Sequence, residues 1–445
     1  MKGEFKLIVF ILIGALFLII DAFYNGFPIV YSDTSTYIAS GLELQTPFDR
    51  PITYGLFLRL FSLNGLSLWF VIFFQGLILS YLIFLLVRQV IGEKLFLPFG
   101  LLTIIFLSFF TGLSWTVSQL MPDIFTSIAL LCLILILLGA VKRRTLFFLY
   151  SLFFISVAMH MSHILLFSLI LVSAFVLRNF ILQKQNYPKA TLRIMILFLL
   201  TIASIVTMGS ALSKSKHVFF MGTMVDKGIL KKYLDENCAT YKYKLCTYKD
   251  SLPTTALDFI WKENSPLYKI GWKESKEEFN EIIYATLTQP KYIIMHIKGS
   301  IKATLQQLIH FNIGDGNGSF LEGTRLYERV FKYFNNDLHN YTLSRQNQSQ
   351  LKAIDFFNVL FIVITILCLC LLVFLIIVKH SIIGKLKAIM ILVFISILLN
   401  AWDCGTFSMA IDRLGCKLIW LIPFITLIAL YKAFHKKRLR TLETA

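Results

Sequence analysis

Two aspartates and two arginines are the side chains best suited to chemistry. Asp33 lies in the polar run Ser32–Tyr37, Asp123 follows a proline, Arg50 follows Asp49, and Arg413 follows Asp412. A carboxylate can act as a general base toward a hydroxyl or amine. Arginine presents a planar fork of donors that matches the oxygens of a phosphate. These residue types together are suited to group transfer away from a phosphate.

Each of these residues also has a purely structural explanation. Ser32 and Asp33 can cap a short helix that begins near Thr34, because their side-chain oxygens accept the free N–H groups of a first turn. Asp123 can cap the helix after it in the same way. An arginine at a membrane edge often only anchors its helix among headgroups, which applies to Arg413.

Three neighbouring side chains complete the candidate set. Tyr37 and Arg50 are further candidates for binding a substrate, although Arg50 can instead pair with Asp49 as an ordinary surface ion pair. His163, in the run His160-Met161-Ser162-His163, is a candidate for a supporting position and is otherwise a polar turn residue. Pro51 suits the first turn of a second short helix.

The composition indicates the class of protein that must position these residues. Of 445 residues, 57% are hydrophobic and 15% charged, against roughly a quarter charged in a soluble domain. The net charge of +18 does not point to nucleic acid, because the basic residues form short clusters between apolar runs. That pattern is typical of lysine and arginine fixing orientation in a membrane. We expect an all-α polytopic membrane protein.

We predict about ten spans, each of about 17 to 25 apolar residues. The first follows Lys2 and Lys6 and lacks a small-residue cleavage site, so we expect a retained anchor. The predicted spans are Leu7–Asn25, Leu66–Val87, Leu95–Leu113, Ile124–Val141, two within Thr145–Phe180 that turn at His160–His163, Ile194–Leu212, Ile354–Val378, Ala388–Trp402 and Lys417–Phe434.

The basic loops between these spans all fall on one side, with the N-terminus and a basic C-terminal tail. The positive-inside rule makes that side the cytoplasm. We therefore divide the chain into a membrane module over residues 1–212 with its first outer loop at 26–65, an extracytoplasmic domain over 213–353, and a membrane module over 354–445. A last outer loop is expected at Asp403–Gly415. Asp33, Asp123 and Arg413 then share the outer face.

The extracytoplasmic domain inserted between spans seven and eight is expected to be mixed but mainly helical. Apolar spacing predicts one helix that ends at Pro290 and another over Ile293–Ile309. The run Gly314–Gly318 is a flexible turn whose acidic spacing does not suit calcium. Cys238 and Cys246 lie close together in an oxidising compartment and are expected to form a disulfide. Cys404 and Cys416 are a second candidate pair.

The order of these motifs resembles the GT-C superfamily of integral-membrane glycosyltransferases. Asp33 matches the acidic residue in the first outer loop of that family. Met121-Pro122-Asp123 resembles the Pro-Asp at the fourth span of the protein-mannosyltransferase and aminoarabinose-transferase branch, and Asp412-Arg413 before Pro423 resembles its Arg-Tyr…Pro ending. Two departures are the absence of a second acidic residue beside Asp33, and Leu414 in place of the tyrosine.

The resemblance implies transfer of a sugar from a polyprenyl-phosphate donor to a lipid, glycan or protein acceptor at the outer face of a plasma (inner) membrane. It implies Asp33 as the catalytic or metal-binding group, Asp123 as a catalytic partner, and Arg413 as the donor-binding residue. No cofactor is certain, and a divalent metal at Asp33 and Asp123 stays open. Membrane lipids and the two substrates are the expected partners, and nucleic acid is not.

Three other classes remain alternatives, one of which is a purely structural or receptor role. An envelope polysaccharide polymerase or ligase would also use lipid-linked sugars but would place its key residues late in the outer segment; candidates there are His296, His310, Arg325, Arg329 and His339. A transporter would carry ionisable residues near the middle of spans and paired broken helices. The apolar runs are largely free of both, which favours an enzyme.

Overall fold

The computed structural model describes residues 2–138, 141–181, 189–208, 211–352, 354–378 and 380–443. Within these ranges every element is a helix, and the only β-structure is one isolated bridge between Ile29 and Gln119. Five of the described helices are long and apolar enough to cross a membrane: Trp69–Ile91, Ala190–Thr207, Ile354–Val378, Leu386–Phe407 and Asp412–Phe434. The prediction of a helical membrane protein is confirmed, whereas the predicted number of about ten spans is not.

The remaining predicted spans correspond to shorter apolar helices. Two of these are α6 (Phe96–Phe110) and α8 (Ile124–Leu138), and α9 and α10 join at residues 159–161, where the sequence predicted a turn. The first predicted span is divided at Ile19. The other bundle helices are α1 (Lys2–Leu18), α2 (Ile20–Asn25), α5 (Trp69–Ile91), α7 (Leu113–Ser118), α9 (Arg143–Ala158), α10 (Ser162–Ile181), α11 (Ala190–Ala203), η1 (Ser204–Met208), α20 (Ile354–Val378), α21 (His380–Phe407), α22 (Asp412–Ile419) and α23 (Leu421–Glu443).

Helix α8 is the centre of the bundle. Every residue from Ile124 to Leu138 is buried, so this helix is surrounded by protein on all sides. By contrast, α20 leaves large apolar side chains such as Phe356, Val359 and Val363 exposed, as expected of a helix that faces lipid. Asp123, which precedes α8 directly, is therefore held at the end of the most enclosed helix.

One predicted loop is shorter than expected. The outer loop expected at Asp403–Gly415 is reduced to residues 408–411, because α21 continues through Asp403 to Phe407 and α22 begins at Asp412. The Asn400 side-chain amide donates to the carbonyl of Leu414 at 2.8 Å and ties the two helices together. Arg413 consequently lies in the first turn of a helix.

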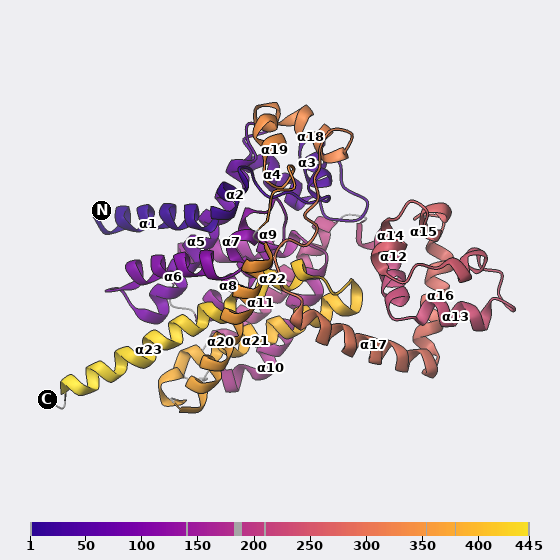
Figure 1. Cartoon of the computed structure of the whole chain (residues 1–445). Coiled ribbons are helices and arrows are strands. Elements are labelled where there is room, and N and C mark those ends of the chain that lie inside the picture. The colour runs from indigo at the N-terminus through magenta and orange to yellow at the C-terminus, as the bar shows by residue number, and fades with distance from the viewer. Residues whose placement is uncertain are drawn as a thin grey trace.

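The loop predicted to be the first outer one folds into two short helices, α3 (Thr34–Glu43) and α4 (Thr53–Phe61). They pack with backbones in contact: a Cβ added to Gly41 would lie 2.1 Å from the carbonyl oxygen of Gly55. Only glycine permits such an approach. Pro51 precedes α4 rather than lying in its first turn. Figure 1 shows this hairpin at the end of the bundle, beside α18 and α19.

The 213–353 segment packs as two parts. Its first part has its own core, which includes Met221, Leu234, Phe259 and Phe279. Figure 1 shows these helices to one side of the bundle. They are α12 (Ala211–Asp226), α13 (Ile229–Asn237), η2 (Lys244–Ser251), α14 (Ala256–Trp261), α15 (Pro266–Ile270) and α16 (Lys276–Thr288). We call them the outer helical domain.

The second part packs on the bundle instead. Leu326, Val330 and Tyr341 belong to the same core as the membrane helices. Its helices are α17 (Pro290–Ile309), α18 (Arg325–Tyr333), η3 (Asn335–Asp337) and α19 (Leu338–Leu343). Bounds of α16 and α17 confirm the two predicted helices, with Pro290 at the start of the second, where its missing N–H is harmless.

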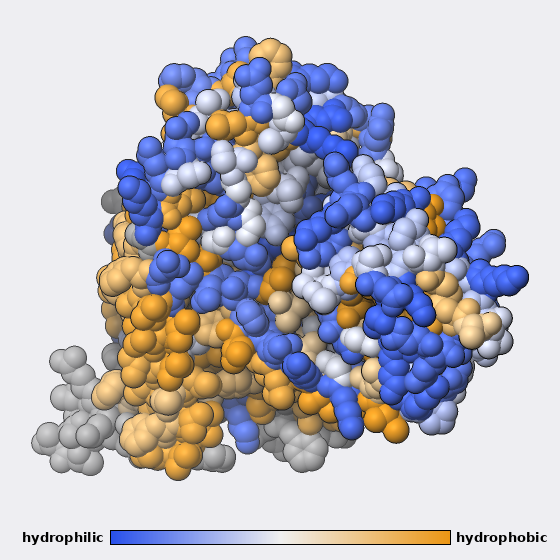
Figure 2. Space-filling view, turned by 45° about the vertical axis from the view of Figure 1, so that its right-hand side comes forward, coloured by the Kyte–Doolittle hydropathy of each residue, from blue (hydrophilic) through white to orange (hydrophobic). Residues whose placement is uncertain are grey.

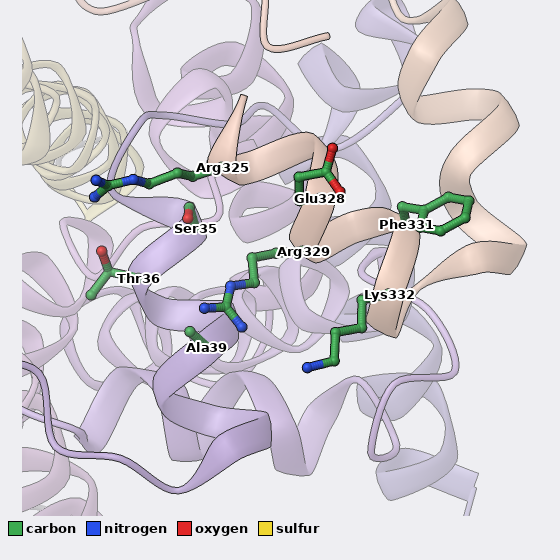
Figure 3. A pocket seen from close by; sticks show the side chains of 8 residues that line it. All are labelled: Ser35, Thr36, Ala39, Arg325, Glu328, Arg329, Phe331 and Lys332. Carbon is green, nitrogen blue, oxygen red and sulfur yellow. The ribbon is translucent and has the colours of Figure 1, made fainter. Parts of the chain in front are cut away.

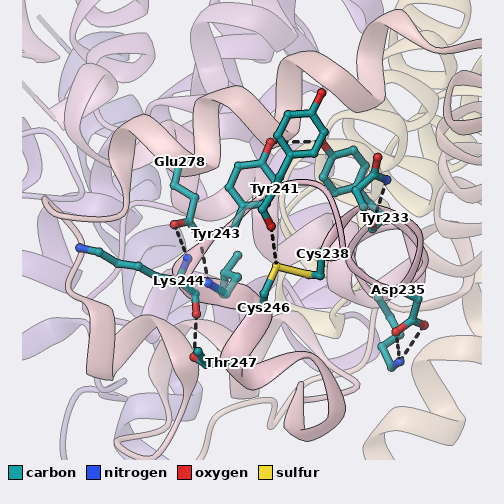
Figure 4. The surroundings of a disulfide bond; sticks show 12 residues. Tyr233, Asp235, Cys238, Tyr241, Tyr243, Lys244, Cys246, Thr247 and Glu278 are labelled. Atoms are coloured by element: carbon teal, nitrogen blue, oxygen red, sulfur yellow. Dashed lines mark hydrogen bonds and ion pairs between the residues drawn. A yellow bond between two sulfur atoms is a disulfide. The ribbon is translucent and has the colours of Figure 1, made fainter.

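A disulfide joins Cys238 to Cys246 in the outer helical domain (Figure 4). Around it, Glu278 accepts hydrogen bonds from the backbone N–H groups of Lys244 and Leu245 at 2.7 and 3.0 Å. The disulfide and this carboxylate together fix η2 against α13 and α16. The other expected pair does not form, since Cys404 and Cys416 are both free thiols.

Candidate active site

The first and second outer loops meet through a short parallel bridge. The backbone N–H of Ile29 donates to Ser118 O at 2.9 Å, and the N–H of Leu120 donates to Ile29 O at the same distance. The Thr34 hydroxyl adds a bond to Leu120 O at 3.2 Å. These bonds set the start of α3 beside the residues that lead into Asp123.

Two buried glutamines support the same loops. Gln75 donates to Val117 O and Gln119 O at 2.8 and 3.0 Å and accepts from the Tyr54 hydroxyl. Gln346 accepts from Val30 N–H at 3.1 Å and donates to Val30 O at 2.8 Å. Side chains from distant parts of the chain therefore satisfy the loop backbone, which buried peptide groups require.

Asp33 occupies the N-cap position of α3 but does not cap it. Its side chain accepts no hydrogen bond from the first turn. One oxygen, Oδ1, instead lies 3.1 Å from Arg50 Nη1, and Arg50 also pairs with Asp49 at 2.5 Å. The capping prediction is wrong for Asp33, because the nearby guanidinium attracts its carboxylate more strongly than a backbone N–H does.

Arg413 lies between the two aspartates. Its Nη1 is 3.8 Å from Asp33 Oδ2 and 3.8 Å from Asp123 Oδ2. The side chains of Asp123 and Arg413 are 6% and 13% exposed, whereas that of Asp33 is 27% exposed. Of the two carboxylates, only Asp33 is open enough for a substrate to reach directly.

Arg413 keeps one donor free. Its Nε is buried and has no hydrogen-bond partner among the described residues. The guanidinium carbon lies 4.3 Å from the centre of the Tyr31 ring, and the backbone N–H donates to Asp315 Oδ2 at 3.3 Å. A buried guanidinium with an unused N–H is costly unless a ligand accepts from it. This donor is a natural contact for an anionic oxygen.

The Gly314–Gly318 run is a wall of this site rather than a free turn. Gly316 has φ +71°, and a Cβ there would lie 1.6 Å from Tyr31 Cε2. The run thus presses its backbone on Tyr31, whose ring in turn covers Arg413. Only glycine combines this φ with such an approach. The dense spacing of glycine around Asp315 was the available signal.

Tyr37 and Arg50 also come together. The Arg50 guanidinium carbon lies 5.3 Å from the centre of the Tyr37 ring. Burial opposes the charge on Arg50, but the carboxylates of Asp33 and Asp49 outweigh it and hold the arginine pKa well above its usual value. Burial also raises the pKa of the Tyr37 phenol. Arg50 is therefore a fixed cation, and Tyr37 a neutral hydroxyl.

His163 contacts the first turn of α8, next to Asp123, rather than the site itself. Its Nε2 lies 2.8 Å from the Thr126 hydroxyl and its Nδ1 lies 2.9 Å from Ser156 O. With both nitrogens engaged and the side chain buried, it can reach Asp123 only through Thr126, whose N–H donates to Asp123 O. In this position His163 stabilises the N-terminus of α8 through its hydrogen bond with Thr126.

Sequence reasoning missed Tyr31, Asp315 and Lys417. Lys417 is buried and lies four residues after Arg413, hence on the same face of α22. The sequence pattern predicts it only as the start of the last span. A lysine within an apolar run is itself a signal, because charge inside a membrane is costly and usually functional.

A cavity of about 660 Å³ opens beside Asp33, between α3 and α18. Figure 3 shows Arg325 and Arg329 extending from α18 toward α3, which contributes Ser35, Thr36 and Ala39. Arg329 pairs with Glu43 of α3, whereas exposed Arg325 makes no ion pair with any described residue. Thr36 lies one helical turn after Asp33, so the cavity opens close to Asp33, whose own side chain is not part of the lining.

The arrangement fits a divalent metal poorly. Both aspartates face guanidinium groups, and Arg413 already occupies the position between them. Among the described residues, no three His, Cys, Asp or Glu side chains gather as a ligand set. Binding an ion there would first require Arg413 to move away, so we derive no step through a metal.

The site as a whole combines one accessible carboxylate, one enclosed carboxylate and two fixed arginines near an open cavity. Such a set can bind an anionic leaving group and deprotonate an incoming hydroxyl or amine. No family model, curated protein or solved structure matches the chain.

Proposed function

We propose that this chain is a GT-C-type membrane glycosyltransferase. It would move a sugar from a polyprenyl-phosphate donor to a lipid, glycan or protein acceptor on the extracytoplasmic face of the plasma (inner) membrane. The observation that carries this proposal is Arg413, which lies between Asp33 and Asp123 with an unused buried Nε. A phosphate oxygen is the partner that such a guanidinium prefers. We also propose that the chain has the GT-C fold with about ten membrane spans.

In the proposed reaction, the acceptor oxygen or nitrogen attacks the anomeric carbon of the donor sugar. The bond from that carbon to the phosphate oxygen breaks, and the polyprenyl phosphate leaves with the bonding electrons. Asp33 takes the proton of the acceptor. A single direct displacement inverts the anomeric centre.

Each other residue has a definite task in this scheme. Arg413 Nε would donate to the leaving phosphate, and Arg50 would add positive charge from the opposite side of Asp33. Asp123 would hold Arg413 in place, because it is too enclosed to reach an acceptor. The cavity between α3 and α18 would admit the acceptor, with Ser35 and Thr36 as hydrogen-bonding groups.

A polymerase or ligase of lipid-linked polysaccharide is the second candidate. The observation that favours it is the presence of Arg325 and Arg329 in the cavity beside Asp33. His310 also comes near the site, since its Nδ1 lies 3.4 Å from Asp412. A transporter is less well supported, because the buried ionisable residues Asp403 and Lys417 lie near helix ends rather than mid-span.

The test is sugar transfer in membranes from a polyprenyl-phosphate-linked pool, with expression levels matched. If the first candidate is right, Asp33→Asn abolishes transfer of single sugars while His310→Ala and Arg325→Ala retain the reaction on small acceptors. If the protein instead transfers polysaccharide chains, as a polymerase or ligase does, His310→Ala and Arg325→Ala lose the activity as completely as Asp33→Asn does. Mass analysis of envelope lipids and glycans, with and without the gene, identifies the sugar.

A further inference from the structure

Helix α17 carries an apolar stripe that no described part of the chain covers. Five large side chains at helical spacing are between 53% and 71% exposed: Ile294, Ile297, Ile301, Leu305 and Ile309. From first to last, the stripe runs about 22 Å along the helix. An unbroken apolar surface of this length marks a binding face.

Two lysines lie directly beside the stripe. Lys298 and Lys302 are exposed and share a shallow groove with Ile301, Leu305 and Ile309. Neither lysine makes an ion pair with another described residue, and the sequence of α17 contains no acidic residue. A helix with an apolar face, flanking lysines and no negative charge is suited to the surface of an anionic membrane.

The position of α17 fits that surface. Its opposite face packs on the outer end of α21: a Cβ added to Gly405 would lie 2.7 Å from the backbone of Ala303. After α17 the chain passes His310 and reaches α20, where the Ile313 N–H donates to the Asn358 side chain at 2.7 Å. Next to Asn358 begin the exposed side chains Phe356 and Val359, which face lipid.

The stripe is thus continuous with the lipid-facing surface of the bundle. Figure 2 shows hydrophobic residues continuing along the lower edge of the molecule, from the bundle to below the outer helical domain. At its other end, α17 joins that domain through Tyr292, which is buried in the domain's core. One helix therefore connects the bundle, the leaflet surface and the outer helical domain.

We propose that α17 is an interfacial helix that rests on the anionic outer leaflet. Its apolar stripe enters the boundary between headgroups and acyl chains, and Lys298 and Lys302 contact the headgroup phosphates. The helix thereby fixes the height of the outer helical domain above the membrane. This inference does not depend on the enzymatic activity proposed above.

The test is photocrosslinking of the full chain in nanodiscs of phosphatidylglycerol and phosphatidylcholine. Benzoylphenylalanine is placed at Ile301 or Leu305, with Val363 of α20 as the lipid-facing control and Tyr284, which is 71% exposed in the outer helical domain, as the aqueous control. We expect phospholipid adducts by mass spectrometry at Ile301, Leu305 and Val363, and none at Tyr284. A single elution peak and an intact disulfide report correct folding.

The lysines are tested in the same nanodiscs. Replacing Lys298 and Lys302 by Gln should lower the ratio of phosphatidylglycerol to phosphatidylcholine adducts at Ile301, by up to about fivefold for each lysine. An unchanged ratio would overturn the anionic part of the proposal. Crosslinks at Ile301 and Leu305 to a second copy of the chain, or the absence of lipid adducts there, would overturn the interfacial helix itself.

Discussion

At the scale of single residues, Asp33 and Asp123 differ in access rather than in type. The Asp33 side chain is 27% exposed, whereas that of Asp123 is 6% exposed and enclosed at the end of α8. We predict that Asp33→Asn lowers transfer by about 10² to 10⁴, the usual contribution of a general base. Folding should be little affected, because Asn keeps the size of Asp33 and can still accept from Arg50, whose charge stays paired with Asp49.

Asp123→Asn is the matched comparison for that measurement. Because Asp123 only holds Arg413 in this scheme, we expect a smaller loss of transfer, expressed mainly as weaker donor binding. Initial rates in membranes over a range of donor concentrations separate the two effects. Near-normal transfer by Asp33→Asn would remove it as the base.

Arg413 tests whether a fork of donors or only a charge is required. Arg413→Lys keeps the cation beside both aspartates but loses the free Nε, so we predict that donor KM rises about 10- to 100-fold, as for loss of a charge-assisted hydrogen bond. Arg413→Ala should be worse and also less stable, because it leaves the buried Asp123 carboxylate unpaired. Thermal unfolding of the purified variants distinguishes a loss of stability from a loss of binding. Equal donor KM values for Arg413→Lys and the unchanged protein would show that donor binding needs only a positive charge.

At the scale of elements, the glycine-rich wall is predicted to matter for activity. In Gly316→Ala the new methyl group would overlap the Tyr31 ring at a φ of +71°, and displacing the ring uncovers Arg413. We expect a loss of transfer of at least tenfold with the chain still folded. Gly323→Ala is the control, because Gly323 has φ +88° and open space around it. If both changes lower transfer equally, backbone strain at positive φ explains the loss, and the contact of Gly316 with Tyr31 does not.

The disulfide belongs to the same scale. Replacing Cys238 and Cys246 by Ser should destabilise the outer helical domain by about 2 to 3 kcal/mol, because a closed loop restricts the unfolded chain. Transfer from the site should persist, since the disulfide lies in a separate core. Limited proteolysis of purified protein measures this: we expect faster cleavage within 211–288 and unchanged cleavage of the bundle, whereas equal rates throughout would contradict it.

Sequence reasoning correctly predicted the elements that a local pattern specifies. Apolar periodicity indicated α16, α17 and α20 closely, and residue type and order selected Asp33, Asp123, Arg50 and Arg413, which lie together. It did not reach contacts made between distant segments. The burial of Tyr31 under Gly316 and the bond of Gln346 to Val30 each join positions about 300 residues apart, and no local pattern encodes them.

Competing local explanations account for the errors. Asp33 has the right position for an N-cap, but Arg50, seventeen residues later, decides where its carboxylate points. Asp403 reads as the start of a loop because it is charged, yet α21 continues past it. In both cases a tertiary partner overrides a residue's usual local preference.

At the scale of the whole molecule, the chain has two distinct ends. Figure 1 shows both termini on the side of the bundle away from α3, α18 and the outer helical domain. The basic clusters that separate the apolar runs are on the terminal side in the expected topology, and the candidate site is on the other. If lysine and arginine set the orientation, the site must face away from the cytoplasm.

That orientation is tested by labelling cysteines in intact cells, in a chain whose exposed Cys370 is replaced by Ser. Ser251→Cys lies on the exposed surface of the outer helical domain, and Glu93→Cys lies between α5 and α6 on the opposite side. We predict that an impermeant maleimide labels Ser251→Cys in intact cells and Glu93→Cys only after lysis. The reverse result would put Asp33 and Arg413 in the cytoplasm, where a lipid-linked donor exposed at the outer leaflet could not reach them.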